Sequence, residues 1–450
     1  MAVTDESEQI RRVTVHAGRP PVAVRRGSGA PFGWWPAICV ALVAAIDRIE
    51  YNLLAGALPT IQEEFGFSDS AGGAIATAGA LAAIILLLPA GKLADTGKRT
   101  WTIAAIVAVW ALLTVGTGLA GSYATLFAVR VLLGAAGQLY NPPSSSLLGD
   151  LYPGPGRARA YGYERMAYFA GLPIGVIAGG ALAQTVGWRT GFFLIAVPGV
   201  IIALLVLTVR EPVRGVGDDL SRWYGDTGPA SVNAPSPALP MREQLVTLLR
   251  IRTLRSVITG LSILFFGLGG LFFWMPSFYA REFGLPEASA AAVGGGAGLV
   301  GIVAGILAGS WIGDRHHERR VAIGGWSLLL GTVFLAGAVS VPALVPQAIC
   351  FTLANAGFAG AIANLTAANA DVVAAHRRGL GFAVLQLLVT LGGALGPWLI
   401  GIASDATGSL RWAYTVVLLP LIVGSLIVLR GQRTYGEDAA AALGGRPGDR

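Results

Sequence analysis

The sequence predicts an all-α membrane protein with twelve transmembrane helices in two six-helix halves. Of its 450 residues, 54% are hydrophobic and only 13% are charged, whereas soluble domains devote about a quarter of their residues to charge. The charges gather in short clusters between apolar runs of about twenty residues, the length that crosses a bilayer. A central stretch rich in Pro, Gly and charge divides these runs into two sets of six.

Apolar runs of bilayer length define the expected spans. In the first half they cover 35–59, 70–94, 100–121, 123–149, 158–185 and 189–209. In the second half they cover 251–280, 288–313, 320–340, 344–370, 378–403 and 410–430. We therefore expect a flexible N-terminal tail at 1–33, a first half at 34–210, a linker at 211–250, a second half at 251–431 and a flexible C-terminal tail at 432–450.

The distribution of Lys and Arg predicts the orientation of these spans. Basic residues crowd the tails, the linker and the loops of one side, whereas the opposite side carries only Arg189, Arg281 and Arg411. Positive loops are retained in the cytoplasm, so both termini and the linker are expected there, in a plasma (inner) membrane. The same dispersal argues against a nucleic-acid binder, which needs one solvated basic stripe.

Residue pairs at a constant offset of 219 indicate an internal duplication. The pairs are Asp95 and Asp314, Asp150 and Asn369, Arg159 and Arg378, and Gly162 and Gly381. Parallel repeats of this kind place a substrate site near the membrane midplane, where the two halves meet.

The loop after the second span reads Gly91-Lys92-Leu93-Ala94-Asp95-Thr96-Gly97-Lys98-Arg99. It resembles the motif that the major facilitator superfamily carries in that loop, and a degenerate copy ends in Asp314-Arg315. Glycine permits close helix approach, and an aspartate can pair with a neighbouring cation or helix end. The resemblance implies a cytoplasmic gate, whose residues are Gly91, Asp95, Lys98, Arg99, Asp314 and Arg315. The alternative is that both stretches are simply positive cytoplasmic loops.

A wider set of segments resembles the Spinster branch of that superfamily, transporters associated with lysophospholipids and sphingoid phosphates. The segments are Asp47-Arg48, Leu58-Pro59-Thr60-Ile61, Arg130 to Tyr140, Arg210-Glu211-Pro212-Val213-Arg214-Gly215 and Gly396 to Asp405. Anion:cation symporters of the superfamily share the Asp-Arg and Arg-Glu-Pro pieces. The resemblance implies a secondary active transporter that works by alternating access.

Ionisable side chains inside a span are costly and are therefore functional candidates. They are Asp47, Arg48, Glu50, Arg130, Glu164 and Arg165. Because adjacent helical residues do not face each other, we expect Asp47 to pair with a cation on another helix. The resemblance implies that this cation is Arg130 and that Arg48 helps to shape a central polar site. A carboxylate in that position can change protonation as the cavity opens, which makes protons the expected coupling ion. The alternative is a static pair that joins the first and fourth spans.

One position departs from the resemblance. Spinster relatives usually place a glutamate eight residues after the arginine of the fourth span, where this chain has Gln138. An amide cannot titrate. We therefore hypothesise that Asp47, assisted by Glu50 or Glu164, carries the proton; a facilitator or an ion-independent exchanger is the alternative.

Aromatic and amide side chains complete the expected substrate cavity. They are Tyr51, Tyr140, Trp274, Tyr279, Asn355, Asn364 and Gln386. A charged half opposite an apolar, aromatic half suits an amphipathic substrate, with Arg48 and Arg130 available for an anionic head. Aromatic residues near helix ends can instead be interfacial anchors.

Several classes of protein are disfavoured by what the sequence lacks. It contains no metal-ligand spacing, no nucleophile with a paired base and no phosphate-binding loop, so we expect neither an enzyme nor an ATP-driven pump, and no cofactor or metal. Among transporters we rank a lysolipid carrier first, a small organic-anion:cation symporter second and a multidrug or metabolite exporter third. One chain holds a complete pathway, so a monomer is sufficient.

Overall fold

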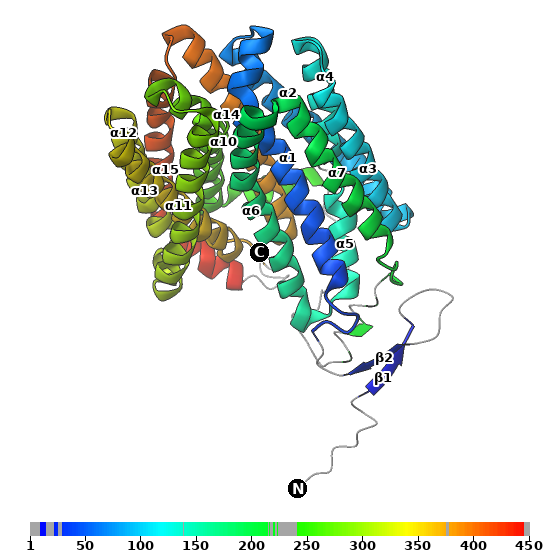
Figure 1. Cartoon of the computed structure of the whole chain (residues 1–450). Coiled ribbons are helices and arrows are strands. Elements are labelled where there is room, and N and C mark those ends of the chain that lie inside the picture. Colours follow the sequence, from blue (N-terminus) through cyan, green and yellow to red (C-terminus); the bar gives the residue numbers. More distant parts are fainter. Residues whose placement is uncertain are drawn as a thin grey trace. The chain divides into compact units, whose positions relative to one another are not determined.

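The computed structural model describes residues 10–14, 22–25, 29–137, 139–214, 216, 219–220, 223, 241–374 and 378–444, and these are almost wholly helical (Figure 1). The first half contains α1 (Trp35–Phe65), α2 (Asp69–Thr96), α3 (Arg99–Gly118), α4 (Tyr123–Gly137), α5 (Asn141–Leu151), α6 (Gly154–Val186) and α7 (Trp188–Leu207). The second half contains α9 (Met241–Arg250), α10 (Arg252–Phe283), α11 (Glu287–Arg315), α12 (Arg320–Ser340), α13 (Leu344–Asp371), α14 (Arg378–Thr407) and α15 (Leu410–Gly444), with the short 3₁₀ helix η2 (His317–Arg319) between α11 and α12.

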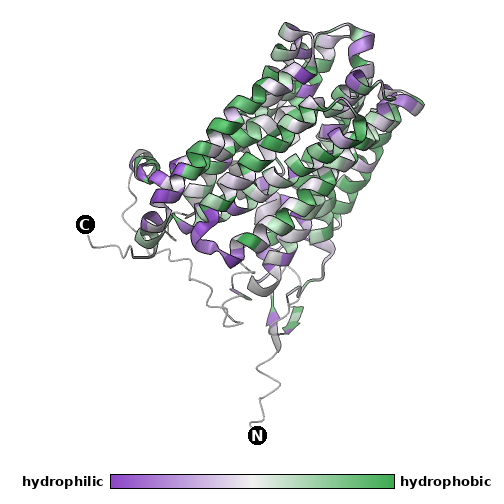
Figure 2. Ribbon diagram, turned by 90° about the vertical axis from the view of Figure 1, so that its left-hand side faces the viewer, coloured by the Kyte–Doolittle hydropathy of each residue, from purple (hydrophilic) through white to green (hydrophobic). Residues whose placement is uncertain are grey.

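The predicted all-α membrane fold is confirmed. Within the described residues, nine helices are long and apolar enough to cross a membrane: α3, α6, α7 and α10 to α15. The other three predicted spans are not among these nine helices, each for a local reason. Helix α1 carries charges in its middle, the described apolar stretch of α2 ends at Ile85, and the fourth span is divided into α4 and α5. Figure 2 shows hydrophilic residues gathered near the helix ends and hydrophobic residues along their middles.

The fourth span was predicted as one helix over 123–149, and this is wrong. Helix α4 ends at Gly137 and α5 begins at Asn141. Pro142 and Pro143 follow directly, and a proline inside a helix lacks the amide proton and clashes with the carbonyl four residues earlier. Proline is tolerated in the first turn of a new helix. The break leaves Tyr140 only 2% exposed at the junction.

Both tails contain regular structure where we expected flexible chain. The N-terminal tail carries an antiparallel hairpin of β1 (Ile10–Val13) and β2 (Val22–Arg25), in which Val13 lies opposite Val22. At the other end, α15 continues through Gly444. Its last turns contain a run of alanines, the best helix former, and Asp438 accepts a 2.9 Å hydrogen bond from the amide of Thr253 in α10.

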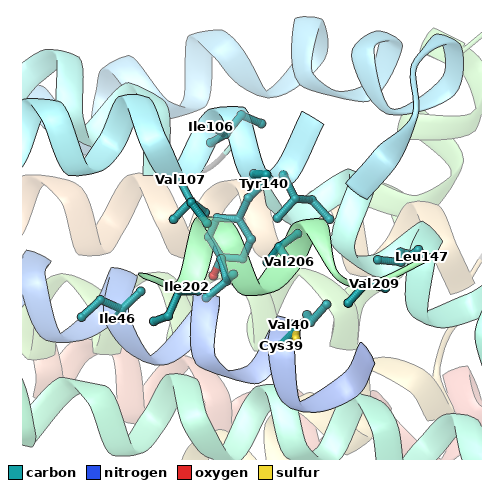
Figure 3. Close-up of a cluster of buried hydrophobic side chains, with 14 of the residues drawn as sticks. Cys39, Val40, Ile46, Ile106, Val107, Tyr140, Leu147, Ile202, Val206 and Val209 are labelled. Carbon is teal, nitrogen blue, oxygen red and sulfur yellow. The ribbon is translucent and has the colours of Figure 1, made fainter. Parts of the chain in front are cut away.

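Residue contacts divide the chain into two compact units. Unit 1 comprises 1–53, 81–175 and 186–233. Its core is the apolar cluster of Figure 3. The cluster contains Cys39, Val40 and Ile46 of α1, Ile106 and Val107 of α3, Tyr140 before α5, Leu147 within α5, and Ile202 and Val206 of α7. Cys39 is fully buried and unbridged, as expected for a small apolar side chain.

Unit 2 comprises 54–80, 176–185 and 234–450, so the ends of α1, α2 and α6 group with the second half. The sequence boundary at 34–210 did not predict this grouping. Close backbone approach explains it: a Cβ added to Gly73 of α2 would lie 2.2 Å from the carbonyl oxygen of Pro397, and one added to Gly180 of α6 would lie 2.7 Å from that of Glu287. Only glycine permits such contacts between helices.

Close backbone approach at glycines also joins α11 to α13 inside unit 2. Glycines recur every four residues along α11 and face α13 at matching intervals: Gly301, Gly305 and Gly309 face its backbone, and Gly313 faces the side chain of Asn364. A Cβ on Gly305 would lie 2.1 Å from the carbonyl oxygen of Ala356. The structure therefore uses this glycine stripe for helix packing.

Candidate functional site

The middle of α1 holds an ion pair between neighbouring residues. Asp47 is 6% exposed and Arg48 is 9% exposed, and Oδ2 of Asp47 accepts a 2.7 Å hydrogen bond from Nε and a second bond from Nη2 of Arg48. Our prediction that Asp47 pairs with Arg130 on another helix is wrong. The long arginine side chain curves back around the helix, and a buried charge that lacks a partner is strongly destabilising.

Arg130 of α4 does pair with α1, but with a carboxylate one turn further along. Its Nη1 donates to Oε1 of Glu50, and its Nη2 donates to the carbonyl oxygen of Tyr51 at 3.3 Å. Glu50 is 0% exposed, and its Oε2 finds no hydrogen-bond partner among the described residues. The expected link between the first and fourth spans therefore exists, with Glu50 in the place we gave to Asp47.

Aromatic rings surround both guanidinium groups. The Arg48 carbon Cζ lies 4.8 Å from the ring centroid of Tyr168 and 5.2 Å from that of Tyr51, and its Nη1 lies 3.3 Å from the Tyr168 hydroxyl. Arg130 lies 5.7 Å from the ring of Phe192. These are cation–π distances. Sequence reasoning missed Tyr168, although it stands four residues after Glu164 and shares its face of α6.

Other candidates of the first half lie less centrally. Glu164 is 6% exposed, and its described ion pair is with Arg165 at 3.3 Å, not with α1. Tyr140 and Asp47 line a cavity of about 10 Å³ together with Trp110, about the smallest volume that holds one water. Neither the Tyr140 hydroxyl nor the Trp110 indole N–H has a hydrogen-bond partner in the described structure. Gln138 lies outside the described residues.

Most cavity candidates of the second half serve as packing groups in unit 2. Trp274 is fully buried and donates a 2.8 Å hydrogen bond to the carbonyl oxygen of Pro397. Asn364 donates to the carbonyl oxygens of Gly309 and Gly360, both at 2.9 Å. Asn355 donates to its own helix, and Tyr279 is 0% exposed. Of the five second-half candidates, Gln386 alone is exposed.

The predicted gate of the first half centres on Arg99. Its side chain is 0% exposed and binds both Asp150 and Glu211, the latter at 2.7 Å from Nε to Oε1. Burial raises the pKa of Glu211, but hydrogen bonds from the Thr100 amide and the Arg99 guanidinium outweigh it, so the pKa lies below its usual value. Lys98 is exposed. The side chains of 86–96, with Gly91 and Asp95, lie outside the described part of the chain.

The second half has an equivalent network around Arg320, which sequence reasoning missed. Arg320 binds Asp371 at 2.9 Å and Asp314 at 3.3 Å, while Arg315 lies over the ring of Trp311 at 3.7 Å. Arg320 and Asp371 stand 221 residues after Arg99 and Asp150. The structural counterpart of Asp150 is therefore Asp371, two residues beyond the Asn369 that the offset of 219 suggested.

Unit 2 also contains a polar network, not predicted from the sequence, at the opposite end of α11. Asp69 is the first residue of α2. Its carboxylate accepts hydrogen bonds from Nη1 and Nη2 of Arg281 at 2.7 and 2.8 Å and from the Ser404 hydroxyl at 2.6 Å. Asp405 accepts the amides of Asp69 and Ser70, both at 2.9 Å. A carboxylate at each of these helix ends was the available signal.

Buried ion pairs inside a bundle of membrane-spanning helices, with matching charge networks in two halves, define a membrane transporter. The family model of the Major Facilitator Superfamily matches residues 40–345 and 299–445. The chain belongs to this superfamily and is an integral membrane secondary transporter, not an enzyme.

Relatives of two kinds are similar over most of the chain. A putative tartrate transporter of Agrobacterium vitis is 27% identical over 415 residues, which cover 88% of this chain and 92% of the relative. Protein spinster of Drosophila melanogaster is 24% identical over 411 residues, 86% of this chain and 65% of the relative. The crystal structure of a bacterial homologue of the human lysosomal transporter Spinster, inward-facing and unoccupied, superposes with a TM-score of 0.80 at 22% identity, covering 90% of this chain and 98% of that one. The likeness to the Spinster branch is confirmed.

Proposed function

We propose that this protein couples protons to the transport of an amphipathic anion, with a lysophospholipid as the first candidate. The observation that carries the proposal is the pair of buried guanidinium groups in unit 1. Each is neutralised by a carboxylate of α1; two aromatic rings lie beside Arg48 and one beside Arg130. Arginine is suited to phosphate and carboxylate groups because its fork binds two oxygens at once.

Competition for Arg48 gives a reason for coupling. Its Nε and Nη2 both donate hydrogen bonds to Oδ2 of Asp47. An anionic head group can therefore bind these two nitrogens only when their bonds to Asp47 break. A proton on Asp47 removes the negative charge that holds the guanidinium. Proton and anion therefore bind together, and loss of the proton restores the internal pair and expels the anion.

Glu50 supplies the second carboxylate. It contacts Arg130, and its other oxygen has no partner in the described residues. We assign the titrating role to Asp47 and Glu50 rather than to Glu164, which pairs with the exposed Arg165. This arrangement compensates for Gln138, which cannot carry a proton.

Two sets of ion pairs are suited to gating. We assign the Arg99 and Arg320 networks to the cytoplasmic side, with both termini and the linker, because the basic loops lie there. The Asp69–Arg281 network then faces the opposite side of a plasma (inner) membrane. Because hydrogen-bonded charge pairs form only in one packing of the helix ends, their alternate formation would favour one open side at a time.

A small organic acid is the second candidate substrate. It is favoured by the similarity over most of the chain to a putative tartrate transporter, and by 23% identity over 415 residues to a hexuronate transporter of Bacillus subtilis. The same two arginines suit carboxylates, and such a substrate would make less use of the aromatic rings.

Flux into liposomes tests both candidates. Purified protein is reconstituted and supplied with labelled lysophospholipid or labelled tartrate, with and without an imposed proton gradient. We expect saturable lysophospholipid flux that the gradient accelerates and that Asp47→Asn and Arg130→Ala abolish. The control is Glu437→Gln, because this residue is exposed and belongs to none of these networks. Tartrate flux alone would favour the second candidate, and flux indifferent to the gradient would refute the coupling.

A further inference from the structure

Helix α9, Met241–Arg250, has an exposed apolar face that no described part of the chain covers. Val246 is 44% exposed and Leu249 is 43% exposed, whereas Leu248 on the neighbouring face is 1% exposed. Residues three apart lie side by side on a helix, so Val246 and Leu249 form one continuous apolar strip. Transfer of this apolar surface from water to an apolar environment would be favourable.

The position of α9 follows from its connection to the spanning helix α10. A single residue, Ile251, separates them, and its extended backbone (φ −66°, ψ 113°) ends the helical path, so α9 is not a continuation of α10. The next turn is fixed to α15: the Thr253 hydroxyl lies 2.7 Å from that of Thr434. Thr434 directly follows Arg433, where the apolar run of α15 gives way to charged residues. The start of α10 therefore lies at the edge of the hydrocarbon, and α9 lies beside it.

Positive charge accompanies this strip. Arg250 at the end of α9, and Arg252 and Arg255 in the first turn of α10, are all exposed. None of the three lies within ion-pair distance of a carboxylate in the described structure. Arg252 and Arg255 are three apart and share a face. Three arginines thus border two exposed aliphatic side chains at headgroup height.

We propose that α9 and the first turn of α10 form a binding surface for anionic phospholipid. Val246 and Leu249 enter the boundary between headgroups and acyl chains, and Arg250, Arg252 and Arg255 bind lipid phosphates. An amphipathic helix with basic flanks binds an interface in this way, and arginine stems can lie along apolar surface while their heads reach charge. The chain itself holds the surface against the bilayer that α10 crosses, which favours lipid over a soluble protein partner.

Native mass spectrometry of the full-length protein tests the charged half of the surface. The protein is released from nanodiscs of mixed phosphatidylcholine and phosphatidylglycerol, and the retained lipids are counted. The test variant combines Arg250→Gln, Arg252→Gln and Arg255→Gln; the matched control combines Arg319→Gln, Arg430→Gln and Arg433→Gln, three exposed arginines elsewhere in unit 2. We expect the test variant to lose phosphatidylglycerol affinity by roughly tenfold or more and the control to lose little. Equal losses, or none, would overturn the proposal.

A fluorescence measurement tests the apolar half independently of these variants. A nitrobenzoxadiazole probe is attached at Val246→Cys in a background that carries Cys39→Ala and Cys350→Ala, and the protein is reconstituted in anionic vesicles. We expect quenching by brominated acyl chains and protection from aqueous iodide. Quenching by iodide without quenching by brominated lipid would place α9 in water and overturn the proposal.

Discussion

Removal of Arg130 should destabilise the protein more than removal of any exposed arginine, because it leaves Glu50 charged and unpaired in a dry interior. Glu50 is 0% exposed, and one of its oxygens already has no partner among the described residues. Breaking a buried ion pair in this way costs about 3–5 kcal/mol. We therefore expect Arg130→Met to lower the free energy of unfolding by about that amount.

The second substitution decides whether the unpaired charge is the cause. Glu50→Gln in the Arg130→Met background removes that charge, and should recover most of the lost stability while transport remains abolished. The free energy of unfolding is measured in lipid bicelles by steric trapping for the wild type, both single variants and the double variant. Arg430→Met is the control: its side chain is exposed, so its loss should cost at most about 1 kcal/mol. A double variant no more stable than Arg130→Met would refute the reasoning.

Three further predictions concern packing, pH and the second charge network. Gly305→Val should separate α11 from α13 and lower expression and thermal stability, because its Cβ would lie 2.1 Å from the Ala356 carbonyl oxygen. The control Gly296→Ala should be tolerated, because nothing lies within 4 Å of a Cβ at that position. The pKa of Glu211 is held below its ordinary 4.5. The contribution of ionised Glu211 to stability is therefore present above pH 4.5 and is lost as pH falls through the lowered pKa. Glu211→Gln should make the melting temperature depend less on pH in the acid range, and an unchanged dependence would contradict the role given to Glu211. Asp69→Asn removes the charge that holds Nη1 and Nη2 of Arg281, so it should lower the melting temperature; an unchanged melting temperature would show that the network does not stabilise that helix end.

The sequence alone was sufficient for the membrane fold, but not for the break in the fourth span. Pro142 and Pro143 stand within the apolar run of the fourth span, and hydropathy alone predicts one helix there. Hydropathy measures whether a segment can lie in lipid, but not whether its backbone can stay helical. The proline rings decided that point, and Tyr140, which directly precedes α5, lines a cavity with Asp47.

The candidate site was anticipated as a set of residues and not as a set of contacts. Asp47, Arg48, Glu50 and Arg130 stood out because charge inside a span is costly. Which carboxylate pairs with which arginine depended on the length of the Arg48 side chain and on the rotation of α1 against α4. Sequence spacing predicts neither. Trp274 and Asn364 likewise looked available for a substrate, but they bind the backbone of neighbouring helices.

By itself the sequence determined the apolar character of the spans and their order along the chain, because a bilayer imposes its requirements on each segment separately. It also determined which charges are unusual, since each one is costly wherever it points. Only the tertiary structure decided which carboxylate holds which arginine, which glycines form contacts, and how the ends of α1, α2 and α6 join unit 2. Those outcomes depend on distances of a few ångströms between helices far apart in the chain.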